Sequence, residues 1–96
     1  MIRRWLGLDR PRVQVTILGV VGGRMIQYTG EVRAATVEAA LRAAGRAARV
    51  DLLGALAAGH QPALLLNGER LDLPEALTRQ TENAATLSWL MPMAGG

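Results

Sequence analysis

The sequence predicts an α+β fold, a mixed sheet of four to five strands with one main helix packed across it. Three observations lead to this prediction. An alternating apolar segment lies near the start of the chain, a segment with helical periodicity lies near its middle, and a continuous apolar segment lies near its end. The predicted order is strand, strand, helix, strand, small elements, strand. A hairpin followed by a helix that buries its apolar side against the sheet is an α+β arrangement.

The first two strands are predicted to form a hairpin. Residues 13–18 alternate with a period of two and are rich in β-branched side chains, which favours a strand. Gly19 and the pair Gly22-Gly23 are predicted to supply the turn. The second strand is expected over residues 24–32, with Gly30 as a bulge.

The main helix is predicted over residues 37–48. Thr36 is suited to the N-cap, and Glu38 in the first turn interacts favourably with the helix dipole. Apolar residues recur at helical spacing, at Val37, Ala40, Leu41, Ala44 and Ala48. Gly45 is expected to weaken this helix by about 1 kcal/mol relative to alanine.

Shorter elements are predicted in the second half of the chain. Residues 51–59 are expected to form a second helix that begins near Asp51 and ends at Gly59. A strand over residues 63–66 ends at an Asn-Gly turn. The sequence then predicts a returning strand around Leu71 and Leu73, a brief turn or helical segment over residues 74–77, and a last strand over residues 86–91 that Pro92 terminates.

Composition is consistent with one globular domain and excludes several kinds of site. Half of the 96 residues are hydrophobic and 20% are charged. Residues 1–12 are expected to be an N-terminal extension, residues 13–92 the folded domain, and residues 93–96 a flexible Gly-Gly tail. The absence of cysteine excludes disulfides, thiolate metal sites and a cysteine nucleophile. The single histidine excludes a metal site built on a pair of histidines. No bound cofactor or metal is expected.

Neither a nucleic acid nor a membrane is an expected partner. The net charge is +3, the arginines are interleaved with acidic residues, and only three residues are aromatic. No apolar run approaches the roughly 20 residues that cross a bilayer, and Asp9 interrupts the short apolar stretch that follows Arg3-Arg4. The expected location is cytoplasmic.

No cluster of residues predicts catalysis, so the chain is not expected to be an enzyme. His60 is interpreted as a solvated loop residue. The glycine-rich segment 19–23 lacks the spacing of a phosphate loop and is interpreted as a hairpin turn. Glu69, Asp72 and Glu75 are interpreted as a solvated acidic edge in preference to a cation site.

The C-terminal tail carries the chemistry that remains. Residues 91–96 follow the last strand directly, and Pro92 stiffens the exit from the sheet. The glycines Gly95 and Gly96 lack Cβ atoms, so they can enter a channel too narrow for other residues. A terminal glycine carbonyl is also unhindered toward adenylation and nucleophilic attack. The alternative is a frayed glycine end without function.

The chain resembles the ubiquitin-like β-grasp sulfur carriers, which include the small subunit of molybdopterin synthase and the thiazole-synthesis sulfur carrier. Residues 63–69 are similar to the family's apolar strand and Asn-Gly turn. Residues 87–96 are similar to its last strand and diglycine tail, with Pro92 where the molybdopterin branch has it. Residues 82–85 depart from the family's usual Asp-Gly-Asp type turn, and residues 50–61 are longer than the thiazole carriers need.

This resemblance implies a β-grasp fold and a carrier function. An E1-like adenylating enzyme would activate Gly96 with ATP and Mg, and a persulfide donor would convert it to a thiocarboxylate. A synthase would then accept the sulfur in molybdopterin or thiamin-type cofactor biosynthesis. Gly95 and Ala94 would thread into the partner's active site, and Met93, Pro92 and Leu90 would dock against it.

Two alternatives remain open at this stage. In the first alternative, the chain is a bacterial ubiquitin-like modifier that an E1-like pathway conjugates through Gly96 to amines of target proteins. The absence of lysine is compatible with both functions, although it excludes lysine-linked chains. The second alternative is a plain β-grasp interaction domain.

Overall fold

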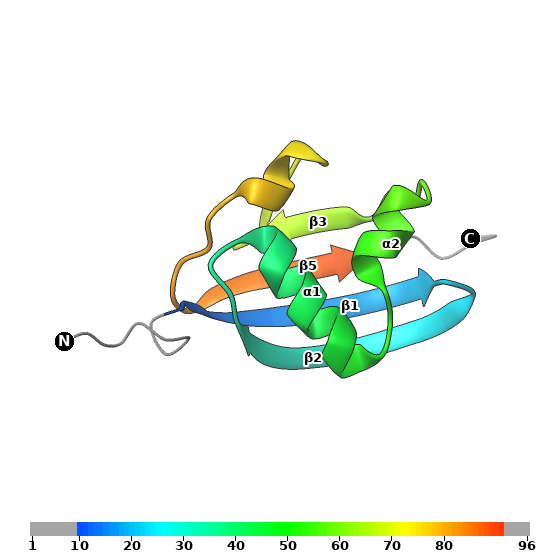
Figure 1. Ribbon diagram of the computed structural model, residues 1–96, viewed down its shortest axis with the longest axis horizontal. Coiled ribbons are helices and arrows are strands. Elements are labelled where there is room, and N and C mark those ends of the chain that lie inside the picture. Colours follow the sequence, from blue (N-terminus) through cyan, green and yellow to red (C-terminus); the bar gives the residue numbers. More distant parts are fainter. Residues whose placement is uncertain (1–9, 92–96) are drawn as a thin grey trace.

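Five strands form one mixed sheet in the computed structural model, which describes residues 10–91 (Figure 1). Two α-helices lie on the same side of the sheet, and the fold is a small α+β structure as predicted. The strands are β1 (Arg12–Val21), β2 (Arg24–Arg33), β3 (Ala63–Leu66), β4 (Glu69–Arg70) and β5 (Ala85–Leu90). The helices are α1 (Val37–Ala48) and α2 (Leu52–Ala57), with a 3-10 helix η2 (Glu75–Thr78).

The last strand lies in the middle of the sheet. The spatial order is β2-β1-β5-β3-β4. β5 pairs in parallel with β1 and antiparallel with β3, whereas β1–β2 and β3–β4 are antiparallel pairs. The end of β5 is therefore flanked by strands on both sides.

The β1–β2 hairpin is longer and more regular than the sequence predicted. Its strands pair without interruption from Arg12↔Arg33 to Val21↔Arg24. The turn consists of Gly22 and Gly23, whose φ angles of 60° and 80° match a two-residue hairpin turn.

Two predictions for glycines in this hairpin were wrong. Gly19 lies inside β1 and not in the turn, because the paired residues continue to Val21. Gly30 is not a bulge, since it pairs in register with Val15. A Cβ at Gly30 would collide with the phenol group of Tyr28, so this glycine gives room to the tyrosine ring that lies across it.

The boundaries of α1 follow from local hydrogen bonds. The Thr36 hydroxyl accepts a hydrogen bond from the Ala39 N–H at 3.1 Å, which confirms the predicted N-cap. The helix ends where Arg49 adopts a left-handed conformation with a φ of 61°. The Arg24 guanidinium donates to the Arg49 carbonyl at 2.6 Å, so the hairpin satisfies a carbonyl at the helix end.

Gly45 has a packing role that its helix propensity does not indicate. The residue is buried, and a Cβ there would lie 2.5 Å from the Val50 carbonyl oxygen. The Val50 N–H donates to the Gly45 carbonyl at 2.9 Å, so the chain folds back closely over this position. The expectation that Gly45 is only a weak point of the helix was therefore wrong.

The small elements after α1 match the predictions except for one strand. Asp51 caps α2 by accepting from the Gly54 N–H at 2.9 Å, and Gly59 follows the helix with a φ of 99°. The returning strand, β4, begins at Glu69, immediately after the Asn67-Gly68 turn and earlier than predicted. The Leu71 N–H still donates to the Leu64 carbonyl of β3 at 2.8 Å, and Leu71 is also buried in the core.

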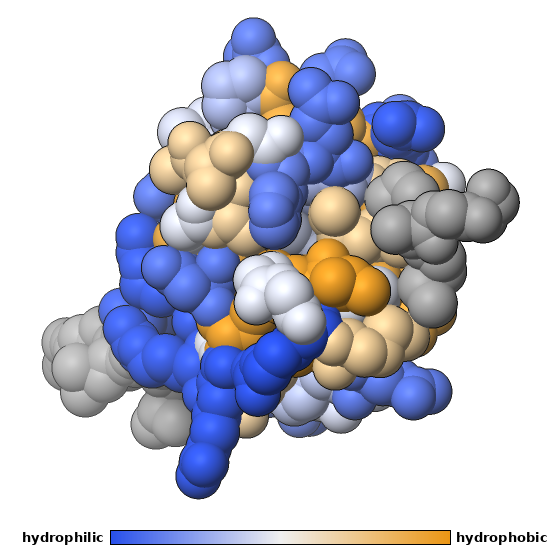
Figure 2. Space-filling view, turned by 90° about the vertical axis from the view of Figure 1, so that its right-hand side faces the viewer, coloured by the Kyte–Doolittle hydropathy of each residue, from blue (hydrophilic) through white to orange (hydrophobic). Residues whose placement is uncertain are grey.

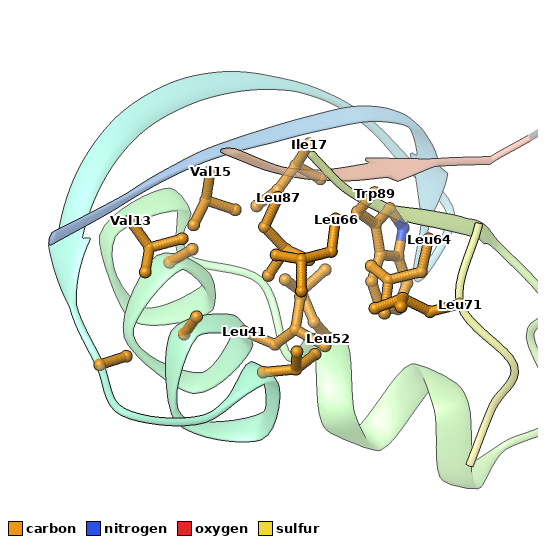
Figure 3. Close-up of a cluster of buried hydrophobic side chains, with 14 of the residues drawn as sticks. Val13, Val15, Ile17, Leu41, Leu52, Leu64, Leu66, Leu71, Leu87 and Trp89 are labelled. Atoms are coloured by element: carbon orange, nitrogen blue, oxygen red, sulfur yellow. The ribbon is translucent and has the colours of Figure 1, made fainter. Parts of the chain in front are cut away.

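The core fills the space between the sheet and the helices (Figure 3). Alternate residues of β1 and β5 point into it, and α1 and α2 contribute leucines from the other side. The residues labelled in the figure are Val13, Val15, Ile17, Leu41, Leu52, Leu64, Leu66, Leu71, Leu87 and Trp89.

Candidate functional site

The chain leaves the sheet from its middle, between β1 and β3. Leu90, the last residue of β5, has Leu18 and Ala63 as its Cα partners on the two sides. One residue further on, the Met91 N–H still donates to the Leu18 carbonyl at 2.9 Å. The polypeptide is thus held by β1 up to Met91, at the end of the sheet that also carries the hairpin turn (Figure 1).

Most of the predicted site residues lie outside the described residues. These are Pro92, Met93, Ala94, Gly95 and Gly96. The structure does describe Leu90, which is half-buried on the sheet face away from the helices. Its predicted docking role stays a prediction, and its position next to β1 and β3 is established.

An apolar patch surrounds Leu90 on the sheet face away from the helices. Leu18, Val20 and Met25 are 40%, 37% and 52% exposed, which is high for large hydrophobic side chains. The strand register brings them next to Leu90 and to two half-buried residues of β3. We call this surface the exit patch, and its members are Leu18, Val20, Met25, Ala63, Leu65 and Leu90.

The exit patch lies at the end of the sheet where Met91 leaves it. Figure 2 faces this end of the molecule and shows apolar surface near the centre, with hydrophilic side chains at its lower left. On the same face toward the opposite end, Gln14 and Glu31 are exposed, and Glu31 forms a 3.8 Å ion pair with Arg12. The open face therefore carries its large exposed apolar side chains at one end, where Gln27 lies opposite Leu18, and polar side chains at the other end.

The exit patch was not predicted from the sequence, although β1 carries a signal for it. The alternation that buries Val13, Val15 and Ile17 assigns Leu18 and Val20 to the solvent side. Apolar residues at solvent-side positions break the pattern of a strand with one exposed face. Met25 gives no such signal, because only the hairpin register brings it opposite Val20.

The other candidate residues form no second site in the described part of the chain. His60 is half-buried, and its Nδ1 atom is buried without a hydrogen-bond partner, so the interpretation as a solvated residue was wrong. Glu69, Asp72 and Glu75 are exposed, as predicted for an acidic edge, and Glu69 pairs with Arg79 at 3.7 Å. Within residues 10–91, no group of three or more His, Asp or Glu side chains is arranged to hold a metal ion.

Residues 10–91 contain no helix that is long and apolar enough to cross a membrane. The chain matches no protein-family model, no curated protein and no solved structure.

Proposed function

We propose that this chain is a ubiquitin-like sulfur carrier with a β-grasp fold. In this proposal the Gly96 carboxylate is adenylated by an E1-like enzyme and converted to a thiocarboxylate. The thiocarboxylate then donates sulfur in the biosynthesis of a cofactor of the molybdopterin or thiamin type. The chain acts as a protein substrate throughout, and ATP and Mg are used by its activating partner.

The position of β5 is the observation that carries the proposal. The last strand lies between β1 and β3 and runs parallel to β1, and this order supports the β-grasp assignment. Because β5 is central, the residues that lead to Gly95 and Gly96 start from the middle of a rigid sheet. A tail that begins from an ordered strand loses less conformational entropy on binding than a tail that follows a flexible segment.

The exit patch supports a docking surface next to the reactive tail. The five residues from 92 to 96 span at most about 17 Å when fully extended. An enzyme that holds Gly96 in its active site must therefore lie close to Met91, and the exit patch is the apolar surface there. Exposed apolar side chains gathered in one region are typical of a protein–protein contact.

The proposed chemistry requires nothing of this chain except its carboxylate. A Gly96 carboxylate oxygen attacks the α-phosphorus of ATP, and pyrophosphate leaves. The terminal sulfur of a protein persulfide then attacks the acyl carbon, and AMP leaves. A second thiol reduces the resulting sulfur–sulfur bond and releases the thiocarboxylate. Both sulfur groups come from partner proteins, because this sequence contains no cysteine.

Intact-mass analysis tests the proposal. The full chain is incubated with ATP, Mg, an E1-like adenylating enzyme from the same organism, and a persulfide donor. We expect a mass increase of one oxygen-to-sulfur exchange, located at Gly96 by fragmentation. The matched control lacks Gly95 and Gly96, and we expect its mass to stay unchanged.

Other outcomes of the same experiment would identify the alternatives. Larger adducts that an isopeptidase removes would indicate a protein modifier instead of a sulfur carrier. An unchanged mass, together with full partner binding by the truncated control, would contradict both functions and leave an interaction domain.

A further inference from the structure

Gly19 is the residue of β1 that lies against the point where the chain leaves the sheet. Its φ of 131° is a conformation that residues with side chains rarely adopt. On one side it pairs normally with Ile26 of β2. On the other side the β1–β5 pairing ends at Leu18↔Leu90, so Gly19 faces the first residue after β5.

The space beside Gly19 is occupied by Met91. A Cβ at position 19 would lie 2.5 Å from the Met91 Cβ, 2.7 Å from its carbonyl oxygen and 3.0 Å from its Cα. All three atoms belong to one residue, and two of them are backbone atoms that cannot rotate away. Any side chain at position 19 must therefore displace the backbone of Met91.

Displacing Met91 changes where the chain separates from β1. The Met91 N–H donates to the Leu18 carbonyl at 2.9 Å, which is the last hydrogen bond of this ladder within residues 10–91. If this hydrogen bond breaks, the chain separates from β1 at Leu90 instead of Met91. The point from which residue 92 continues the chain would then shift.

We propose that Gly19 is a positioning residue for the reactive tail, acting through Met91. This inference rests on the proposed function, in which an enzyme docked at the exit patch must receive Gly96 in its active site. Gly19 leaves room for Met91 to pair with β1, and in the proposal it acts on the tail only through the position of Met91. Its absence of a side chain is what permits Met91 to stay paired with β1.

Docking and tail entry are separate steps, so their defects have different kinetic signatures. A variant of the exit patch weakens docking and raises the KM of the activating enzyme for this chain. A misdirected tail leaves docking intact and lowers kcat, because misplacement by about 1 Å can slow a reaction by up to about 100-fold. Partial unfolding gives a third result. It reduces the concentration of competent substrate, which raises the apparent KM and leaves kcat unchanged.

The test measures ATP–pyrophosphate exchange by the E1-like enzyme with the full chain as its substrate. For Gly19→Ala we expect kcat to fall on the order of tenfold with little change in KM. Gly23→Ala is the matched control, because Gly23 has a φ of 80° and open space where its Cβ would be. Gly23→Ala also places a side chain at a positive φ and so loses stability for that reason, but it does not touch Met91. We therefore expect it to keep the parental kcat.

Amide hydrogen exchange of Met91 gives a second measurement that does not depend on the enzyme. We expect Gly19→Ala to lose the protection of the Met91 amide while the Trp89 amide stays protected. If Gly19→Ala folds poorly, the double variant Gly19→Ala/Met91→Gly removes the Cβ–Cβ collision and should recover part of the lost kcat.

The proposal is overturned if Gly19→Ala keeps both the parental kcat and the Met91 protection. It is also overturned if protection is lost and kcat does not change. If the parent chain supports no exchange at all, the proposed function fails. In that case the hydrogen-exchange result still decides whether Gly19 holds Met91 against β1.

Discussion

The two faces of the sheet use alternate residues of the same strands in different ways. On the face toward the helices, Val13, Val15 and Ile17 of β1 are completely buried. On the opposite face, Leu18 and Val20 of the same strand are exposed. The difference does not come from side-chain type, because all five residues are aliphatic.

This comparison separates the residues that stabilise the fold from those available for a partner. Burial removes apolar surface from water and stabilises the fold by roughly 25 cal/mol per Å². Leu18, Val20 and Met25 of the exit patch keep 40%, 37% and 52% of their surface exposed, so each contributes less to stability than a completely buried residue. They gain more burial only when another surface covers them, which is why we assign them to docking. Four predictions test this separation, ordered from the largest expected change in stability to the smallest.

The largest loss is expected at Leu87, which is completely buried in β5 between sheet and helices. Leu87→Ala should lower the free energy of unfolding by about 2–5 kcal/mol, because it removes buried methyl groups and leaves a cavity. Chemical denaturation measures the change. The control is Ser88→Ala on the next residue, which lies on the open face and should change stability by at most about 0.5 kcal/mol. Equal losses would contradict the separation of the two faces.

A smaller loss is expected at Gly45, on the side of α1 that faces the core. Gly45→Ala should destabilise by about 1–3 kcal/mol, because its Cβ would overlap the Val50 carbonyl oxygen. Helix propensity alone would predict a gain of about 1 kcal/mol. The reciprocal control, Ala47→Gly at an exposed position of the same helix, should cost about 1 kcal/mol from propensity. A stabilised Gly45→Ala protein would show that propensity outweighs packing here.

The N-cap of α1 should contribute less than the core. Thr36→Ala removes the hydroxyl that accepts from the Ala39 N–H and should cost about 1 kcal/mol. Thr36→Ser keeps an acceptor at the same position and should retain most of the parental stability. Thermal or denaturant unfolding of both variants measures the difference, and equal losses in the two would exclude capping as the cause.

The smallest effect on stability is expected in the exit patch. Leu18→Thr combined with Met25→Thr keeps strand-compatible side chains and should change the free energy of unfolding by at most about 1 kcal/mol. The KM of the proposed activating enzyme for this chain should nevertheless rise on the order of tenfold, because the apolar contact surface is lost. Gln14→Thr, at the polar end of the same face, is the control and should leave the KM unchanged. If the free energy of unfolding fell as much as is expected for Leu87→Ala, the exit patch would be part of the stabilising core and its assignment to docking would be wrong.

The elements predicted correctly are those whose causes are local. The period of β1, the Thr36 cap, the start of a second helix near Asp51, and the Gly22-Gly23 and Asn67-Gly68 turns depend on neighbours within a few residues. A hydrogen bond in the structure confirms the Thr36 cap, and another shows that Asp51 caps α2. The returning strand begins earlier than predicted, at Glu69, because the β3–β4 pairing starts directly after the Asn67-Gly68 turn, and the Leu71 N–H continues this pairing to the Leu64 carbonyl.

The glycines mark the limit of prediction from sequence. Gly19, Gly30 and Gly45 were interpreted as a turn, a bulge and a weak point. Each instead gives room to another residue, namely Met91, Tyr28 and Val50. A sequence shows that a side chain is absent, and it does not show which atoms occupy the space. The exit patch was missed for a related reason, because strand register brings its members together.

By itself, the sequence determined the α+β class, the bounds of the main helix and the chemistry that the residues make available. Periodicity, capping and the absence of cysteine are properties of short segments or of composition, so they can be read without coordinates. Only the tertiary structure decided that β5 lies between β1 and β3, that Met91 leaves the sheet beside Gly19, and that apolar side chains surround this exit. Those facts depend on which distant segments pair, and strand pairing is set by the packing of the whole sheet against its helices.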